Sequence, residues 1–159
     1  MYNFFVESKQ INNNRAIIMG NDYNHIVNVL RFKIGQKFYI CNKENSKSYL
    51  SEIILIDDEK VTCKLISEND STELSIDVAI FQGIPKSDKM DLIIQKCTEL
   101  GAKEFYPVEM KNCVMKLNNE EKKIDRWQKI AEASSKQSKR NVIPKIYNKL
   151  SFQGMISEI

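Results

Sequence analysis

The sequence is poor in the residues that build compact catalytic and metal sites. Its 159 residues include one histidine, His25, so a Ser-His-Asp or Cys-His arrangement has a single histidine to use. The four cysteines form no Cys-x-x-Cys pair, which argues against a zinc site and a disulfide framework. The five glycines are never adjacent, so no glycine-rich loop exists. We therefore expect no bound metal.

Long hydrophobic runs are also missing. No apolar stretch approaches the ~20 residues of a membrane span, and the N-terminus lacks the basic region and apolar core of a secretory signal. These absences predict a cytoplasmic protein without a membrane partner.

Positive charge is concentrated in one part of the chain. The formal net charge is only +3, but residues 122–149 contain nine Lys and Arg against Asp125 and Glu132. Such a stripe suits the phosphate backbone of a nucleic acid. A solvated lysine-rich helix face would have the same composition, so charge alone leaves both interpretations open.

The first part of the chain reads as a small β domain. Alternating apolar residues and turn signals predict several short strands and one helix, which favours a barrel. The polar stretch 68–73 is the best candidate linker, which gives a domain over residues 1–70. The expected strands cover residues 2–6, 16–19, 37–42, 48–56 and 60–67, and the helix covers residues 21–30.

The second part, residues 75–159, alternates strands with long helices. This alternation predicts a parallel sheet with helices packed against it. Ligands of open α/β sheets gather where parallel strands end, which draws attention to Lys86, Lys89 and Asp91. The expected strands are 75–82, 104–108 and 143–146; the expected helices are 87–100, 120–139 and one that begins at residue 151.

The helix 87–100 has an apolar face, a polar face and both end signals. Ser87 is the expected N-cap, and Gly101 follows as a stop. Packing explains the apolar face but does not require the mixed charges on the other. The apolar positions are Met90, Ile93, Ile94, Cys97 and Leu100, and the polar ones are Lys89, Gln95, Lys96 and Glu99.

A second helical phrase, residues 126–140, carries Trp127, Ile130, Ala131 and Ser134 at helical spacing and ends in Gln-x-x-Arg. A third phrase, His-x-x-x-Val-Leu-Arg, runs from His25 to Arg31. Together with Lys-Met-Asp-x-x-x-Gln-Lys-x-x-Glu-Leu-Gly, these phrases resemble the 16S ribosomal RNA uracil-N3 methyltransferase family, RsmE, in the same order and separation. The resemblance covers nearly the whole chain.

The resemblance implies an α+β two-domain protein: an N-terminal PUA-like β-barrel followed by the first part of an α/β SPOUT domain with a trefoil knot. It also implies a homodimeric enzyme that transfers a methyl group from S-adenosylmethionine to N3 of a uridine in 16S ribosomal RNA, acting on the small ribosomal subunit. A stand-alone RNA-binding module and a SPOUT enzyme for transfer RNA are the alternatives.

The resemblance and the strand-end argument also point to individual residues, without identifying a catalytic one. Many relatives have a basic residue where this chain has Asn3, and Arg15 could replace that contact. The expected RNA-binding or substrate-positioning residues are Arg31, Lys86, Lys89, Gln137 and Arg140. The expected structural or supporting residues are His25, Gln95, Lys96 and Glu99.

One part of the family pattern is missing. Relatives form the S-adenosylmethionine site with an Ile-Gly-Pro-Glu-Gly-Gly loop and a Leu-Gly-x-x-Ile-Leu-Arg segment, and neither occurs here. We expect the cofactor site beyond Ile159 and the 159 residues to be inactive by themselves. A coding sequence that continues into Gly-Pro-Glu-Gly-Gly would indicate an enzyme, whereas a stop codon would favour the binding module.

Overall fold

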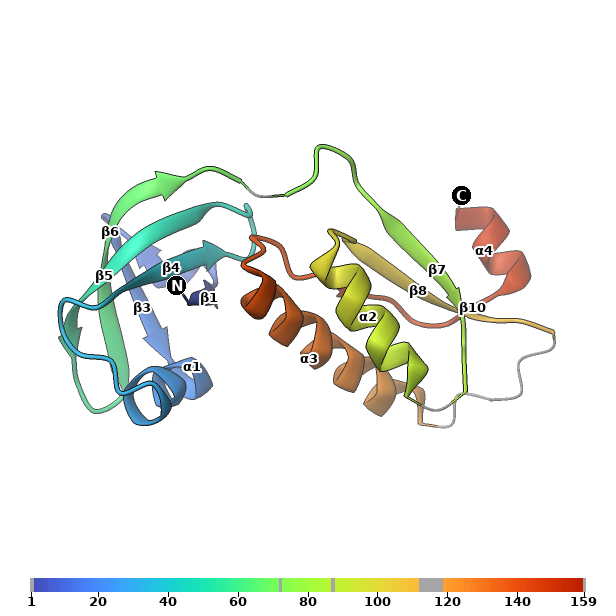
Figure 1. Ribbon diagram of the computed structural model, residues 1–159, viewed down its shortest axis with the longest axis horizontal. Helices are drawn as coiled ribbons and strands as arrows, with labels where there is room; N and C mark the ends of the chain where they lie inside the picture. The colour runs from blue at the N-terminus through green and yellow to red at the C-terminus, as the bar shows by residue number, and fades with distance from the viewer. Residues whose placement is uncertain (1, 72, 87, 112–118, 159) are drawn as a thin grey trace. The chain divides into compact units, whose positions relative to one another are not determined.

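The computed structural model describes residues 2–71, 73–86, 88–111 and 119–158 (Figure 1). The chain divides into two compact units, Met1–Thr72 and Glu73–Ile159. Each unit has its own hydrophobic core and is described by itself below.

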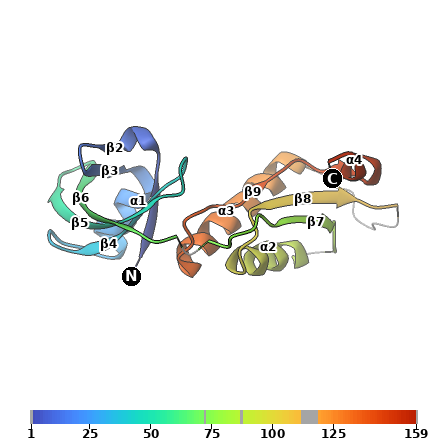
Figure 2. The ribbon, with the colours of Figure 1, turned by 90° about the horizontal axis from the view of Figure 1, so that it is seen from above.

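The first unit is a curled six-stranded sheet with the strand order β1-β4-β5-β6-β3-β2. β1 and β4 are parallel, and the other neighbours are antiparallel. Figure 2 shows the curl from a second direction. The small β domain expected from the strand pattern is therefore present. Its strands are Asn3–Val6 (β1), Ile11–Asn12 (β2), Arg15–Met19 (β3), Lys37–Asn42 (β4), Ser48–Ile56 (β5) and Lys60–Asn69 (β6).

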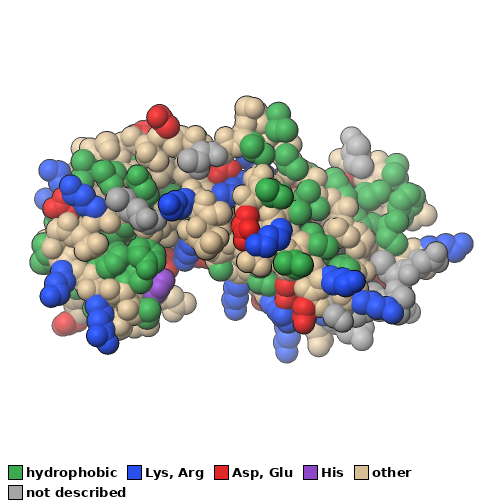
Figure 3. Space-filling view, in the orientation of Figure 1, with side chains coloured by type: hydrophobic (Ala, Val, Ile, Leu, Met, Phe, Trp, Pro, Cys, Tyr) green, Lys and Arg blue, Asp and Glu red, His purple; other side chains and the backbone are tan. Residues whose placement is uncertain are grey.

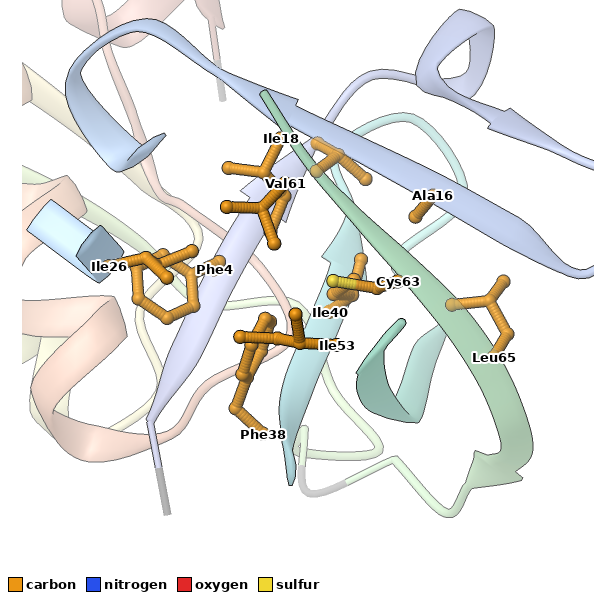
Figure 4. Packing of buried hydrophobic residues seen from close by; sticks show 11 residues of the cluster. Phe4, Ala16, Ile18, Ile26, Phe38, Ile40, Ile53, Val61, Cys63 and Leu65 are labelled. Atoms are coloured by element: carbon orange, nitrogen blue, oxygen red, sulfur yellow. The ribbon is translucent and has the colours of Figure 1, made fainter. Parts of the chain in front are cut away.

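The core of this unit fills the concave side of the sheet (Figure 4). Alternate residues of β3 and β6 point inward, so Ala16, Ile18, Val61 and Cys63 are almost completely buried while their neighbours face outward. Burial raises the pKa of the Cys63 thiol to about 12. Cys63 therefore behaves as a small apolar side chain and not as a nucleophile.

Two local features differ from the expected strands and helix. The short 3₁₀ helix Ser8–Gln10 and the strand β2 were missed; β2 turns into β3 through Asn13 and Asn14, which both have positive φ. The helix expected over residues 21–30 is an α-turn, Gly20–Asn24 (α1), followed by a π-helical turn, His25–Val29. The wider turn is closed by the Leu30 amide, which donates to the His25 carbonyl at 2.8 Å.

The expected linker is shorter than the polar stretch suggested. β6 continues to Asn69, so residues 68 and 69 are strand, paired with β5. Glu73, at the other end of the stretch, belongs to the second unit and has a buried side chain. The polar composition of residues 68–73 predicted an exposed linker. A sequence alone does not show that one of these charges, Glu73, has a buried partner.

The second unit is a parallel sheet, as the alternation of strands and helices predicted. β7 pairs with one edge of β8, and β9 and β10 pair in succession with the other edge. Its strands are Ala79–Gly83 (β7), Glu104–Glu109 (β8), Lys145–Ile146 (β9) and Leu150–Ser151 (β10); its helices are Lys89–Glu99 (α2), Glu120–Ser138 (α3) and Phe152–Glu158 (α4).

Helices α2 and α3 lie side by side and cover one face of this sheet (Figures 1 and 2). The row Ile80, Phe105 and Ile146 runs across β7, β8 and β9 and faces the helices. Trp127 and Ala131 of α3 pack into the same core.

The elements expected in the second unit are correct in outline but differ from the structure in two details. The buried line of α2 is Met90, Ile94 and Thr98, whereas Leu100, expected in the core, is 77% exposed because the helix has ended at Glu99. The strand expected from residue 75 begins only at Ala79. The expected cap Ser87 lies outside the described residues, and Asp88 is the N-cap residue.

Candidate functional site

One carboxylate at the start of α2 contacts both long helices of this unit. Asp91, in the first turn of α2, accepts a hydrogen bond from the Trp127 indole Nε1 at 3.1 Å and an ion-paired one from Arg126. Asp91 is largely covered, with 22% of its side chain exposed. This carboxylate therefore fixes the start of α2 against the first half of α3.

The lysines expected at the strand end lie beside this contact. Lys86 follows the carboxyl end of β7, Lys89 opens α2, and both are exposed. Asp88 is 86% exposed, 3.7 Å from Arg126. Acidic and basic side chains lie interspersed over the helix pair on the face seen in Figure 3. This end of the unit therefore presents exposed cations to solvent.

The other end of the helix pair is closed by a buried ion pair. The Arg140 guanidinium donates to both carboxylate oxygens of Glu73, and the two side chains are only 6% and 7% exposed. The same guanidinium donates to the Thr98 carbonyl at 3.1 Å and to the Ala102 carbonyl. Arg140 thus satisfies carbonyls at the end of α2, where a cation also complements the helix dipole.

Glu73 receives further donors from the segment after α3. The backbone amides of Asn141 and Val142 donate to its Oε1 at 2.8 and 3.2 Å. Next to it, Leu74 lies against Gly101, where an added Cβ would stand 2.5 Å from a Leu74 methyl group. Gly101 also has φ +110°, so the expected helix stop has a second reason to be glycine.

These contacts change the interpretation of Arg140. The resemblance led us to expect an arginine that binds RNA or positions the substrate, whereas in the structure its guanidinium faces Glu73 and two carbonyls inside the unit. Gln137, one turn earlier, is exposed. Nine residues of helix, about 14 Å at 1.5 Å per residue, separate Lys89 from Thr98. The structure therefore divides the expected site residues of this unit between two ends.

The expected supporting residues are found in ordinary surroundings. Gln95 and Lys96 are exposed on α2, and Lys96 forms an ion pair with Glu99 at 2.9 Å. In the first unit the half-buried His25 ring meets Phe4 edge to face, with centroids 6.0 Å apart. Arg31 is exposed just after the π-helical turn and has φ +53°.

An aromatic row on the sheet face away from α2 and α3 was missed. Phe81 and Tyr106 stack at 4.6 Å, and Tyr106 and Tyr147 at 4.3 Å. Both tyrosine hydroxyls donate to Glu104 at 3.1 Å, and burial, with these bonds, raises the pKa of Tyr106. Lys145 stands 4.3 Å above the Tyr147 ring. Strand register brings these rings together, and the sequence alone did not provide that register.

The outer face of α3 has a shallow depression of about 490 Å³ lined by Lys122, Arg126 and Lys129. This is part of the basic stripe seen in the sequence. Among the described residues, no group of three His, Cys, Asp or Glu could hold a metal ion. No helix within the described ranges is long and apolar enough to cross a membrane.

Comparison with known proteins agrees with this two-part fold. The family described as RNA methyltransferase domain matches residues 72–159, and the RNA methyltransferase PUA domain matches residues 18–66. The chain is 38% identical over 145 residues to ribosomal RNA small subunit methyltransferase E of Bacillus subtilis (strain 168), covering 89% of this chain and 56% of that protein. The chain belongs to the RNA methyltransferase family whose domain matches residues 72–159.

A relative of the same name from Mesomycoplasma hyopneumoniae (strain 232) is 31% identical over 159 residues, covering 99% of this chain and 66% of the relative. The chain thus spans between half and two thirds of the length of these family members. A crystal structure of a hypothetical protein superimposes with a TM-score of 0.90 at 37% identity, covering 98% of this chain and 66% of that one.

The family member from Neisseria gonorrhoeae, solved bound to S-adenosyl methionine, shares the fold with a TM-score of 0.85 at 21% identity. It is covered over 65% of its length, and this chain over 100%. The fold expected from the sequence, a PUA-like domain followed by a methyltransferase domain, is confirmed.

Replacing Glu73 by alanine should strongly destabilise the second unit, because it leaves the Arg140 charge buried without its partner. We expect a loss of about 3–5 kcal/mol, measured by urea unfolding followed through the fluorescence of Trp127. Glu132→Ala is the matched control, because Glu132 pairs with Lys136 on the surface of the same unit and is 37% exposed. An unchanged midpoint for Glu73→Ala would contradict the structural role of this pair.

Replacing Asp91 by alanine should shift the emission of Trp127, the only tryptophan, because the indole loses its acceptor. The unfolding free energy should fall by about 1–3 kcal/mol. Asp88→Ala removes a neighbouring acid near the same Arg126 but no hydrogen bond to the indole, so it should leave the emission of Trp127 unchanged. Equal spectra for the two variants would show that Asp91 does not position the helix pair.

Proposed function

We propose that the protein containing this chain transfers a methyl group from S-adenosylmethionine to N3 of a uridine in 16S ribosomal RNA. The observation that carries the proposal is the 38% identity to a ribosomal RNA small subunit methyltransferase E, which spans both units in the same order. Relatives solved with bound S-adenosyl methionine or SAM, from Neisseria gonorrhoeae and Legionella pneumophila, support the choice of methyl donor.

The chemistry requires three things of the protein. The weakly acidic N3–H of uracil must lose its proton, the base must be exposed from its stack, and N3 must be held in line with the methyl group. Positive side chains that bind the neighbouring phosphates contribute to the last two requirements, because they fix the RNA without reading its sequence.

The described residues suit the RNA part of this task. We propose that Lys86 and Lys89 contact phosphates at the carboxyl end of β7, and that Arg31 and Gln137 contact RNA from exposed positions. Arg140 would act as a positioning residue, because it ties the segment after α3 to Glu73 and leaves Gln137 in a defined place on the last turn. His25, Gln95, Lys96 and Glu99 would support these elements.

The cofactor does not fit the residues at the strand ends. Lys86 and Lys89 would repel its sulfonium, and no glycine-rich loop allows a backbone to approach its adenosine. We therefore propose that its site is formed by the part of the family's length that this chain does not span, beyond Ile159. The 159 residues by themselves would then be inactive.

Other features of the family enter as proposals in the same way. The full-length protein would work as a homodimer on the small ribosomal subunit, in the cytoplasm. A stand-alone RNA-binding module without catalysis is the second candidate. It is favoured by the exposed cations of both units together with the poor fit of the cofactor.

The activity can be tested in Bacillus subtilis that lacks its own ribosomal RNA small subunit methyltransferase E. Expression of the complete reading frame that encodes this chain should restore 3-methyluridine in digested 16S ribosomal RNA, measured by mass spectrometry. The same strain with an empty vector is the control. Methylation of a different nucleoside, or none, would contradict the proposed reaction.

The location of the cofactor site can be tested by titrating S-adenosylmethionine into the 159-residue chain by calorimetry. We expect no heat at millimolar ligand, whereas the Bacillus subtilis relative serves as the positive control. Binding with one ligand per chain would mean that the site lies within these residues, and the proposal of a site beyond Ile159 would be wrong.

A further inference from the structure

A groove of about 760 Å³ opens on the outer face of the first unit. Its floor is the row Ile17, Thr62 and Leu55, which are neighbours across β3, β6 and β5. These side chains point away from the core because Ala16 and Ile18, on either side of Ile17, are buried. Leu55 is 49% exposed, so the floor presents apolar surface to solvent.

The rim of this groove is positively charged. The groove is lined by three basic residues, Arg15, Lys9 and Lys60, and by one acidic residue, Asp57. Lys9 pairs with Glu7 at 2.6 Å, and Lys60 lies 3.8 Å from Asp57. Arg15 differs from both lysines: within the part of the chain that the structure describes, it has no ion-pair partner.

The strand register places a second cation opposite Arg15. Arg15 on β3 is the direct partner of Lys64 on β6. On the other side of β6, Lys64 is the register partner of Glu52 on β5. The Glu52 carboxylate, however, lies 3.8 Å from the Lys37 amine. Like charges directly opposite each other on a sheet are destabilising. A bound anion would reduce the repulsion between Arg15 and Lys64. This part of the sheet therefore suits the binding of an anion.

The tip of the groove is polar. Asn13 and Asn14 turn the chain with φ +45° and +60°, which places Asn12 and Asn13 on the rim beside Arg15. Both amides are exposed and can donate and accept hydrogen bonds. None of the residues lining the groove is aromatic, so it lacks the stacking platform of a base-reading site.

We propose that this groove binds the phosphate and sugar backbone of RNA, with Arg15 and Lys60 on phosphates and the Ile17 and Leu55 side chains under the ribose. The inference rests on the proposed function, because it assumes that the substrate is RNA. It adds a contact face, formed by β3, β5 and β6, that is separate in sequence from Arg31. The volume of the groove is that of a site for a unit of nucleotide size.

The test compares two double variants by fluorescence anisotropy with a labelled, uridine-containing single-stranded RNA. Arg15→Gln with Lys60→Gln removes the two groove cations. Lys37→Gln with Lys47→Gln removes two cations of the same unit that do not line the groove and that face Glu52 and Glu68. Both variants change the net charge equally.

We expect the groove variant to bind RNA about tenfold or more weakly, with a salt dependence whose logarithmic slope falls by about 1.4, because each phosphate contact with a single strand contributes about 0.7. The control variant should remain close to the wild type. Arg15→Gln should also raise the urea midpoint, because it removes the repulsion from Lys64. This second readout distinguishes a lost RNA contact from a misfolded variant.

Two results would overturn the inference, and they are distinguishable. If the wild type binds RNA and both double variants bind equally well, the groove is not a contact and the proposed function stands. If the wild type does not bind RNA, the proposed function fails together with the inference. Photo-crosslinking with 4-thiouridine RNA should label peptides within residues 9–17 or 55–62.

Discussion

The second unit depends on the buried ion pair between Glu73 and Arg140. Burying two charges costs free energy unless each forms several hydrogen bonds. Here Glu73 also accepts hydrogen bonds from two backbone amides, and Arg140 donates to two carbonyls. The pair joins the first residue of the unit, the end of α2 and the segment after α3. Three stretches distant in sequence are thus fixed at one point.

The helix pair is therefore held at both ends by carboxylates. Asp91 binds Trp127 where α2 begins, and Glu73 binds Arg140 where it ends. Between them the apolar line of α2 packs on the sheet, which leaves the polar face of α2 outward. The interior polar contacts hold the frame, and the exposed lysines remain available for a ligand. This division explains why residues of one motif have different surroundings.

The outlines of the fold could be predicted from the sequence because they rest on local patterns. Alternation gave β4 and β5 with correct ends, and helical spacing gave α2 and α3 within two residues at each end. Local patterns did not show what distant contacts decide: Leu100 points to solvent, Glu73 leaves the linker for the interior, and Arg140 becomes buried. The expected roles of Arg31, Lys86, Lys89 and Gln137 stay predictions.

The sequence by itself determined the family, the order of the two units and the types of their main elements, because apolar periodicity and motif spacing are properties of neighbouring residues. The tertiary structure decided which charges are paired and which are exposed. It also placed Arg15 opposite Lys64 and stacked Phe81, Tyr106 and Tyr147, since strand register joins residues far apart in the chain. Whether a cation binds a ligand or holds the fold depends on its neighbours in space.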